Sequence, residues 1–475
     1  MRGRTNVPPR PEAIVNGKLN DFVVANNSSI DVGDFVEIER TKGYQAIGDT
    51  VLNFAVHADI SDTLKVVSYT NTTSTTYDFR VSLIDISTGT ARILDTYVFT
   101  RPNARINGGT DYAIRSTSVI VLDDSSIVCG TSRFYSGDPM VVRLKVVDNK
   151  FVVSEEFVAK NSIRGVDNGS LVKLSEKRFA LVCGLRIVVF TYTSSSITYV
   201  KDITASAYTF NKYASAFAGA TSDGRIILMT YNGDDAEYQQ SYFFELLKLD
   251  TSNNLSLLGY VDTDWSKNLT DSYSYTIQYA MPLANDGVIV FSRKYIGSGS
   301  ASKIYTLMSI LFDASNISIG MTTTFGSIFR EVYPSITSLT EEYCKMYRIA
   351  NNTFVTAVRT GNTCMYGVVN VDSTGFSLLT NALTFVHQTN VLTYPVTDMI
   401  ALFSDDYLYL IGRGYVNSNA SLNQLKLKYT PSDNYIEIGE DTVYVRKYTG
   451  GKAIGFAKTG GNAGQVVKIY TPATE

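Results

Sequence analysis

Short runs of Val, Ile, Leu, Phe and Tyr alternate along the chain with turns rich in Asp, Asn, Gly and Ser. This alternation is typical of β-strands joined by tight turns. The 3.6-residue apolar spacing that marks amphipathic helices is almost absent. The pattern therefore predicts an all-β chain.

One apolar run recurs seven times and serves as the anchor of a repeat. Its copies are at residues 64–69, 127–131, 179–184, 226–230, 288–293, 354–359 and 408–413. Equivalent positions in successive copies are 46 to 66 residues apart, and six intervals separate Ser68 from Gly412, a mean of about 57. Another strand-like run precedes the anchor in several copies, and one or two follow it. Each repeat therefore predicts a sheet of four strands.

Seven such repeats favour a propeller over separate hairpin sheets. A lone four-stranded sheet of this kind would expose two apolar faces and two open edges. Radial packing around an axis buries both faces of every sheet, which fits anchor runs that lack clean apolar–polar alternation. A β-solenoid is the alternative, but its repeats are shorter and more regular. The sequence thus predicts a seven-bladed β-propeller over residues 47–440.

The two flanks of the repeat region, residues 1–46 and 441–475, also contain short strand-like runs. These lie at 12–18, 31–38, 451–457 and 464–470. A closed ring brings its first and last blades side by side, and neither flank alone has enough apolar residues for a core. We therefore expect both flanks to form one small β-domain, into which the propeller is inserted.

The same flanks carry a resemblance. Residues 32–38 (VGDFVEI), 451–461 (GKAIGFAKTGG) and 463–470 (AGQVVKIY) resemble small β-barrel modules of tailed-phage virion proteins, including capsid-decoration and fibre-attachment proteins. The resemblance implies a non-catalytic virion component, assembled in the host cytoplasm, whose terminal module docks on other virion proteins. The propeller would then bind a host-surface glycan or protein, as a monomer or a homo-oligomer.

Two other functions fit the same fold. One is a glycan-cleaving, sialidase-like propeller enzyme. The other is a purely structural head, neck or tail protein that binds no host ligand.

The composition excludes several function classes. The chain has two histidines, His57 and His387, which leaves little room for histidine bases, triads or zinc sites. Its net charge is −3 with no basic block, so we expect no nucleic-acid partner. No window approaches 18 apolar residues, and residues 1–10 lack the apolar stretch of a secretory signal, so we expect neither membrane insertion nor secretion.

Five residues are candidates for ligand binding. Arg293, Arg359 and Arg413 recur at the ends of anchor runs, and clustered arginines bind carboxylates well. The alternative is that they cap strand ends at a solvated rim. Tyr273 and Tyr275 lie in a tyrosine-rich stretch of a chain with 32 Tyr and one Trp. Tyrosine suits both adaptable recognition surfaces and ordinary strand packing.

Adjacent acids recur along the chain, at residues 123–124, 155–156, 234–235, 341–342 and 405–406. A glycosidase needs two carboxylates that converge on one bond. Neighbours along a strand point to opposite faces, and acids in turns are usually solvated. We therefore predict no catalytic residue among them.

No metal or cofactor site is predicted either. The acidic segment 234–237 lacks the ligand spacing of a known calcium loop. The four cysteines are too scattered for a CxxC metal site or a disulfide framework. Cys129 and Cys183 occupy equivalent places in consecutive repeats, which indicates small, buried, apolar residues.

Overall fold

The computed structural model is all-β, which confirms the predicted fold class. It describes residues 18–24, 29–40, 44–48, 52–72, 77–87, 91–99, 114–133, 140–158, 169–175, 177–209, 213–220, 224–231, 239–268, 275–282, 287–296, 302–312, 316–324, 343–350, 352–360, 363–371, 376–381, 383–386, 394–404, 407–416, 419–438, 443–450, 453–462 and 465–471. The helices in these ranges are single 3₁₀ turns, η3 (Ala205–Ala207) and η4 (Pro431–Asp433). None of the described helices has the length and apolar character to span a bilayer.

Across the described ranges, most strands fall into seven antiparallel sheets, which we call the ring. The first two sheets contain β5 (Leu52–Asp59), β6 (Leu64–Thr72), β7 (Tyr77–Asp85) and β8 (Arg92–Phe99), then β9 (Ile114–Val121), β10 (Ile127–Arg133), β11 (Met140–Val147) and β12 (Lys150–Val158). The third and fourth contain β13 (Gly169–Ser175), β14 (Arg178–Cys183), β15 (Arg186–Tyr192) and β16 (Ile197–Thr204), then β17 (Tyr213–Ala220), β18 (Arg225–Tyr231), β19 (Gln239–Leu249) and β20 (Leu255–Asn268).

The remaining sheets of the ring follow the same strand order. The fifth contains β21 (Tyr275–Pro282), β22 (Gly287–Ile296), β23 (Ser302–Phe312) and β24 (Ile317–Thr324). The sixth contains β25 (Tyr343–Ala350), β26 (Thr353–Thr360), β27 (Thr363–Val371), β28 (Phe376–Leu378) and β29 (Leu383–Val386). The seventh contains β30 (Tyr394–Ser404), β31 (Tyr407–Val416), β32 (Asn419–Thr430), β33 (Tyr435–Ile438) and, from the other end of the chain, β4 (Tyr44–Gly48).

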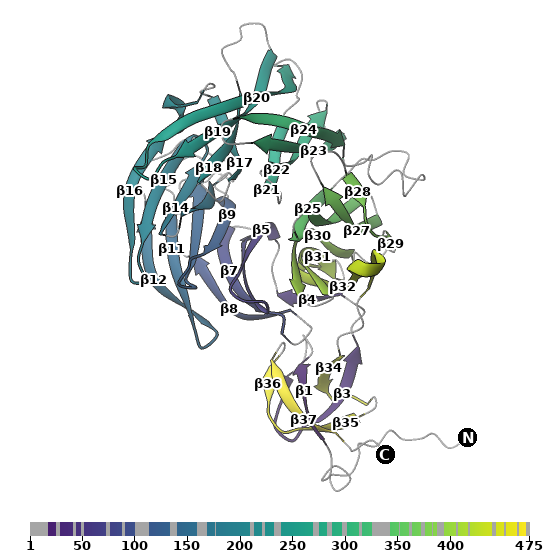
Figure 1. Ribbon diagram of the computed structural model, residues 1–475. Coiled ribbons are helices and arrows are strands. Elements are labelled where there is room, and N and C mark those ends of the chain that lie inside the picture. Colours follow the sequence, from purple (N-terminus) through teal and green to yellow (C-terminus); the bar gives the residue numbers. More distant parts are fainter. Residues whose placement is uncertain are drawn as a thin grey trace, which may run out of the picture.

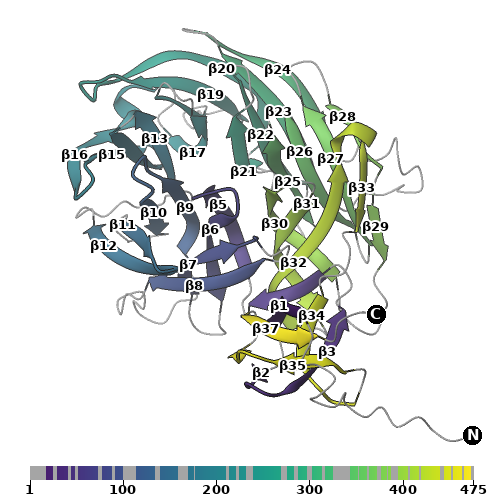
Figure 2. The ribbon, with the colours of Figure 1, turned by 60° about the horizontal axis from the view of Figure 1, so that its bottom comes forward.

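The sheets stand around a common centre as the blades of a β-propeller do (Figures 1 and 2). First strands of neighbouring sheets contact each other, for example β5 with β9 and β30 with β5. The first strand of each sheet is therefore the innermost, and the fourth lies at the rim. Each anchor run of the sequence is the second strand of its sheet.

The core of the ring lies between the sheets. In β14, Phe179 and Leu181 pack against the second sheet, whereas Ala180 and Val182 pack against the fourth. All four side chains are buried. Both faces of the strand are therefore covered, which explains why its sequence is a continuous apolar run.

The outer strands share an irregularity that the sequence pattern does not reveal. Five outer strands each contain a bulge at which one residue has no partner on the third strand of its sheet; these residues are Leu94, Ser154, Val200, Leu258 and Gly320. Each bulge lies at the same level of its sheet. Bulges at sheet edges increase the local twist and hinder pairing with a foreign strand.

The outer strand is interrupted at this same level in the last two sheets. In the sixth sheet, β28 ends at Leu378 and β29 resumes at Leu383 along β27. In the seventh, β32 pairs with β33 up to Leu427 and with β4 from Leu425. The outer strand of the seventh sheet is thus assembled from both ends of the chain, and this closes the ring.

Strands from the two flanks form a separate closed barrel, which we call the terminal barrel. It contains β1 (Lys18–Val24), β3 (Phe35–Arg40), β34 (Val443–Lys447), β35 (Ala453–Ala457) and β37 (Val466–Thr471), with β2 (Ser29–Ile30) pairing β36 (Gly461–Asn462) beside it. The barrel lies outside the ring, next to the sheet that contains β32 (Figures 1 and 2). The β4 strand, which spans the boundary predicted at residue 46, pairs with the ring.

We expect Gln424→Ala to weaken the closure of the ring. The Gln424 side-chain oxygen accepts a hydrogen bond from the buried backbone N–H of Ala91, at 2.5 Å, across the junction of the seventh and first sheets. Loss of this acceptor leaves the N–H unsatisfied, which costs about 1–3 kcal/mol of unfolding free energy. Urea unfolding followed by fluorescence of the single Trp265 measures the change.

Lys428→Ala is the matched control on the same strand. Lys428 pairs with Glu437 at 3.7 Å, and both side chains are exposed. Such surface pairs contribute about 0–1 kcal/mol. Equal effects of the two substitutions would contradict a role for Gln424 in closure.

Candidate functional site

The structure brings the three predicted arginines to equivalent places. Arg293, Arg359 and Arg413 lie in β22, β26 and β31, the second strands of three successive sheets. Each is in the C-terminal half of its strand. Their side chains, and that of Tyr275 in β21, lie outside the described part of the structure, as does the whole of Tyr273. Convergence of these five residues on one ligand stays a prediction.

The cysteine prediction is confirmed for both residues. Cys129 and Cys183 are fully buried in the interfaces between sheets. Burial raises the pKa of the Cys183 thiol to about 12 and that of Cys129 further. Both thiols are therefore protonated and unreactive at neutral pH. The acidic segment 234–237 and the pairs 341–342 and 405–406 lie outside the described residues.

One histidine participates in a polar cluster on the inner strands of the ring, which we call the His57 cluster. His57 of β5 has its Nδ1 hydrogen-bonded to the hydroxyl of Tyr347 in β25. Its Nε2 lies 3.3 Å from Asp59 Oδ1, and Lys65 Nζ lies 3.0 Å from the same oxygen. The cluster joins the first and sixth sheets, which flank the seventh sheet on either side.

Tyr347, His57 and Asp59 are arranged in a row, as the groups of a proton relay are. Their electrostatics nevertheless favour a structural role, in which the cluster holds two sheets together. Burial raises the pKa of Tyr347, and the charge of Asp59 adds to the effect. The hydroxyl therefore stays protonated and is hydrogen-bonded to His57 Nδ1, while Nε2 faces Asp59. Both imidazole nitrogens are thus engaged by protein groups, which leaves neither to act as a general base.

We expect Asp59→Asn to remove part of the acid sensitivity of the fold. Hydrogen bonding by His57, with smaller contributions from the charges of His57 and Lys65, lowers the pKa of Asp59 to about 2. Because the folded-state pKa lies below the ordinary value of 3.8, the carboxylate stabilises the fold above about pH 4, and this is lost as the pH falls toward 2. Thermal melts between pH 2 and 6 measure the difference.

The difference between the wild type and Asp59→Asn should be largest above pH 4 and small at pH 2. Asp62→Asn provides the control, because Asp62 lies in the same hairpin but, unlike Asp59, forms no ion pair with another described residue. A pH-independent difference for Asp59→Asn would show that the carboxylate charge does not matter.

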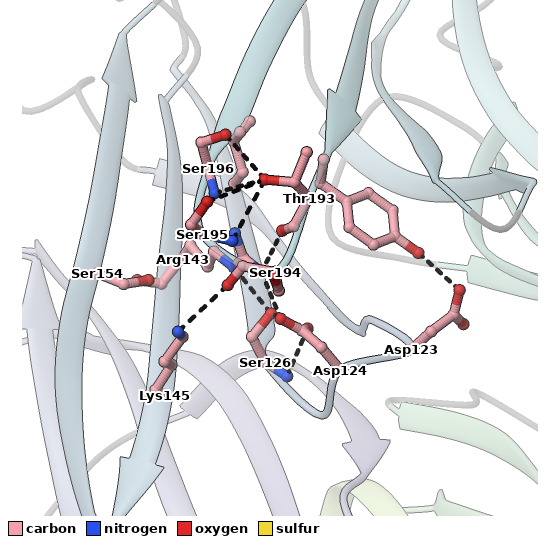
Figure 3. Close-up of polar contacts among 12 residues, drawn as sticks. Asp123, Asp124, Ser126, Arg143, Lys145, Ser154, Thr193, Ser194, Ser195 and Ser196 are labelled. Atoms are coloured by element: carbon pink, nitrogen blue, oxygen red, sulfur yellow. Dashed lines mark hydrogen bonds and ion pairs between the residues drawn. The ribbon is translucent and has the colours of Figure 1, made fainter.

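A second polar cluster is centred on Arg143 of β11 and joins the second and third sheets (Figure 3). The guanidinium is fully buried. Its Nη2 donates to Asp124 Oδ2 at 2.5 Å and to the Thr193 carbonyl at 2.8 Å, and its Nε donates to Ser126 Oγ at 2.9 Å. Its Nη1 lies 3.5 Å from Glu155 Oε2. We call these residues the Arg143 cluster.

Asp124 lies in a turn and is partly exposed to solvent, as expected from the sequence, but it is also paired with Arg143. Burial alone would raise the pKa of Asp124, but hydrogen bonds from Ser126 and the charge of Arg143 hold it below its ordinary value. Glu155 also accepts a hydrogen bond from the Ile197 backbone N–H, at 2.6 Å. The carboxylates of Asp124 and Glu155 are therefore both paired with other protein groups, and the cluster connects the second and third sheets.

The terminal barrel is built jointly from the two flanks of the chain. Four of its five strand pairings join a strand before the ring to one after it; these are β1–β34, β34–β3, β3–β35 and β37–β1. Its core likewise draws Val24, Ile30 and Val36 from the first flank and Val445, Ala457, Val467 and Ile469 from the last. Each flank therefore needs the other in order to fold.

An ion pair between a buried Glu37 and a partly exposed Arg446 also links the flanks within the barrel. Glu37 is 2% exposed, and its Oε1 accepts hydrogen bonds from Arg446 Nε at 2.8 Å and Thr449 Oγ1 at 2.7 Å. Nearby, Gly33 in the turn before β3 has a φ of 91°, a conformation that favours glycine. Val32 in the same turn is 70% exposed. The turn thus presents an apolar side chain to solvent.

The functional groups that the sequence pattern missed are His57, Asp59, Tyr347 and Arg143. Their partners are up to 290 residues away in the chain, so local spacing gives no signal for them. In the described residues no group of three or more His, Cys, Asp or Glu side chains is arranged to hold a metal ion.

No protein-family model matches the chain, and no curated protein matches it. Solved structures match at low identity. The WD40 domain of Toxoplasma gondii coronin is 9% identical, with 90% of each chain covered and a TM-score of 0.44. The polysaccharide lyase Uly1 is 11% identical, with 84% of this chain and 100% of the lyase covered and a TM-score of 0.44. A protein from Lactobacillus plantarum is 8% identical, with coverages of 86% and 99% and a TM-score of 0.43.

Proposed function

We propose that this protein is a non-catalytic display protein. The terminal barrel docks on a larger assembly, and the ring, as a closed seven-bladed propeller, binds a host-surface glycan or protein. The observation that carries the proposal is the composition of the barrel. Because both ends of the chain fold into one module, the whole propeller is presented from a single base.

The larger assembly that we propose is a tailed-phage particle. Support comes from the resemblance of the flanks to virion β-barrel modules, and the strands β3, β35 and β37 cover the residues of that resemblance. The partners would then be other virion proteins and further copies of this chain. The protein would be assembled in the host cytoplasm and carried on the virion.

The position of the barrel supports display of the ring. In Figures 1 and 2 the barrel lies at the rim of the ring and not over its centre. A barrel docked on a particle would therefore leave the ring accessible for a ligand. Tyrosine and arginine side chains near the ends of the ring strands are the groups we propose for ligand contact, with Arg359 as the representative.

Immunogold labelling of purified particles, with an antibody against the ring, tests the docking step. We expect gold on the particles, and mass spectrometry of the same fraction should detect the chain. Labelled particles with no binding of the purified protein to host cells would favour the purely structural role. Absence of the chain from every particle fraction would overturn the virion assignment.

Binding to host cells tests the display step. We expect the fluorescently labelled protein to bind cells, and periodate or protease treatment of the cells distinguishes a glycan from a protein receptor. The glycan-cleaving alternative draws support from the equivalent positions of Arg293, Arg359 and Arg413. Release of sugar from host glycans that Arg359→Ala abolishes would favour the enzyme.

A further inference from the structure

Both connections between the terminal barrel and the ring leave the ring at one point. Residues 41–43 join β3 to β4, and residues 439–442 join β33 to β34. At the start of β4, Tyr44 pairs with Leu425 of β32, and at the end of β33, Ile438 pairs with Leu427. The barrel is therefore inserted into the outer strand of the seventh sheet, at the level where other outer strands bulge.

The two strands at this point, β4 and β33, are short but connect three sheets, and we call them the seam. Asn381 of the sixth sheet exchanges two hydrogen bonds with the backbone of Ile436 in β33, at 2.8 and 2.9 Å. Ile47 of β4 packs against the cluster between the seventh and first sheets. The seam thus holds the sixth, seventh and first sheets together.

Formation of the seam requires β4 to pair with β32, a segment hundreds of residues later in the chain, whereas β33 follows β32 through a short turn. Strands of four or five residues gain few contacts of their own. Loop-closure entropy opposes the meeting of segments that are hundreds of residues apart. The barrel shares this cost with the seam, because β3 pairs directly with β34, and these two strands lie only a few residues from β4 and β33 in the chain.

We propose that the terminal barrel is the clasp of the ring: the seam stays closed because the barrel is folded, and the two unfold as one cooperative unit. Any partner that binds only the folded barrel must then also stabilise the ring, by mass action. Docking of the barrel would therefore raise the free energy of unfolding of the propeller. This coupling goes beyond the docking function and does not depend on which assembly the barrel binds.

The single tryptophan allows a direct test on the full-length protein. Trp265 lies in β20 of the fourth sheet, so its fluorescence reports on the ring and not on the barrel. Val467→Ala removes buried side-chain atoms from the barrel core, whereas Leu19→Ala alters a side chain that is 44% exposed. We expect Val467→Ala to shift the Trp265 unfolding midpoint to lower urea concentration and Leu19→Ala to leave it unchanged.

Hydrogen exchange of residues 453–471 and 287–312 follows the barrel and the ring separately in the same samples. In Val467→Ala both segments should exchange faster by a similar factor. Faster exchange in the barrel with an unchanged Trp265 midpoint would overturn the clasp.

A second variant covers the case in which Val467→Ala does not fold. Insertion of 20 Gly/Ser residues between positions 440 and 441 leaves both modules intact but makes one of the two connections between them long and flexible. We expect a lower Trp265 midpoint than for the same insertion between positions 74 and 75, in the hairpin that joins β6 to β7. Equal midpoints would contradict the proposal. These measurements use neither particles nor host cells, so their failure is distinct from a failure of the docking function.

Discussion

Replacement of Arg143 by methionine lowers the unfolding free energy of the ring by about 1–3 kcal/mol. The substitution keeps most of the side-chain volume but removes the positive charge from a fully buried site. The carboxylates of Asp124 and Glu155, at 2.5 and 3.5 Å from the guanidinium, are then left without their counter-charge. Urea unfolding followed by Trp265 fluorescence measures the loss.

Two further variants separate this effect from a general loss of charge. Lys173→Met breaks the pair with Asp123 between the same two sheets, but these side chains are 42% and 49% exposed. It should cost no more than about 1 kcal/mol. Adding Asp124→Asn and Glu155→Gln to Arg143→Met should recover part of the loss, since neither side chain then carries a charge that has lost its partner. Equal losses for Arg143→Met and Lys173→Met would rule out a buried ion cluster as the junction.

The strands of the ring could be predicted from the sequence because their signal is local. A strand that is covered on both faces is a continuous apolar run, as Phe179 to Cys183 illustrates. Seven such runs recur along the chain, and this repetition indicates the repeated sheets. The prediction of an all-β propeller rests on this signal and is confirmed. The apolar pattern of the sequence does not predict the bulges in the outer strands, because a single unpaired residue leaves that pattern unchanged.

The polar clusters could not be predicted, for a related reason. Arg143 and Asp124 are 19 residues apart, and His57 and Tyr347 are 290 apart, so their pairing depends on how the sheets pack. Adjacent acids were expected to be solvated in turns, yet the ring places an arginine over one of them. The repeat correctly predicts that Arg293, Arg359 and Arg413 lie at equivalent positions of three successive sheets. That they bind one ligand together stays a prediction.

The flanks were the hardest part to predict in detail. The β1 strand at Lys18–Val24 follows the run expected at 12–18, which lies outside the described residues, and the β34 strand was not foreseen. Both are short, and their partners come from the opposite end of the chain. A glycine in β35 has a similarly non-local role, and it gives the second large effect that we expect.

Replacement of Gly455 by alanine prevents the terminal barrel from closing. An added Cβ at this position would overlap the Tyr470 carbonyl oxygen and lie 2.8 Å from the carbonyl carbon of the same residue. Both atoms belong to the backbone of β37, so no side-chain rotation can relieve the overlap. The pairing of β35 with β37 must therefore open. We expect complete loss of hydrogen-exchange protection over residues 453–471 and, on the proposed function, loss of the protein from particles.

Gly450→Ala makes the same chemical change in the same module without the overlap. Gly450 has a φ of 121° and no atom within 4 Å of an added Cβ, so the cost is backbone strain of about 1–3 kcal/mol. This variant should keep a protected barrel and should still enter particles. A Gly455→Ala protein that retains protection equal to that of Gly450→Ala would show that β35 and β37 can move apart without opening the barrel. Protection lost with particle entry retained would instead locate docking outside the barrel.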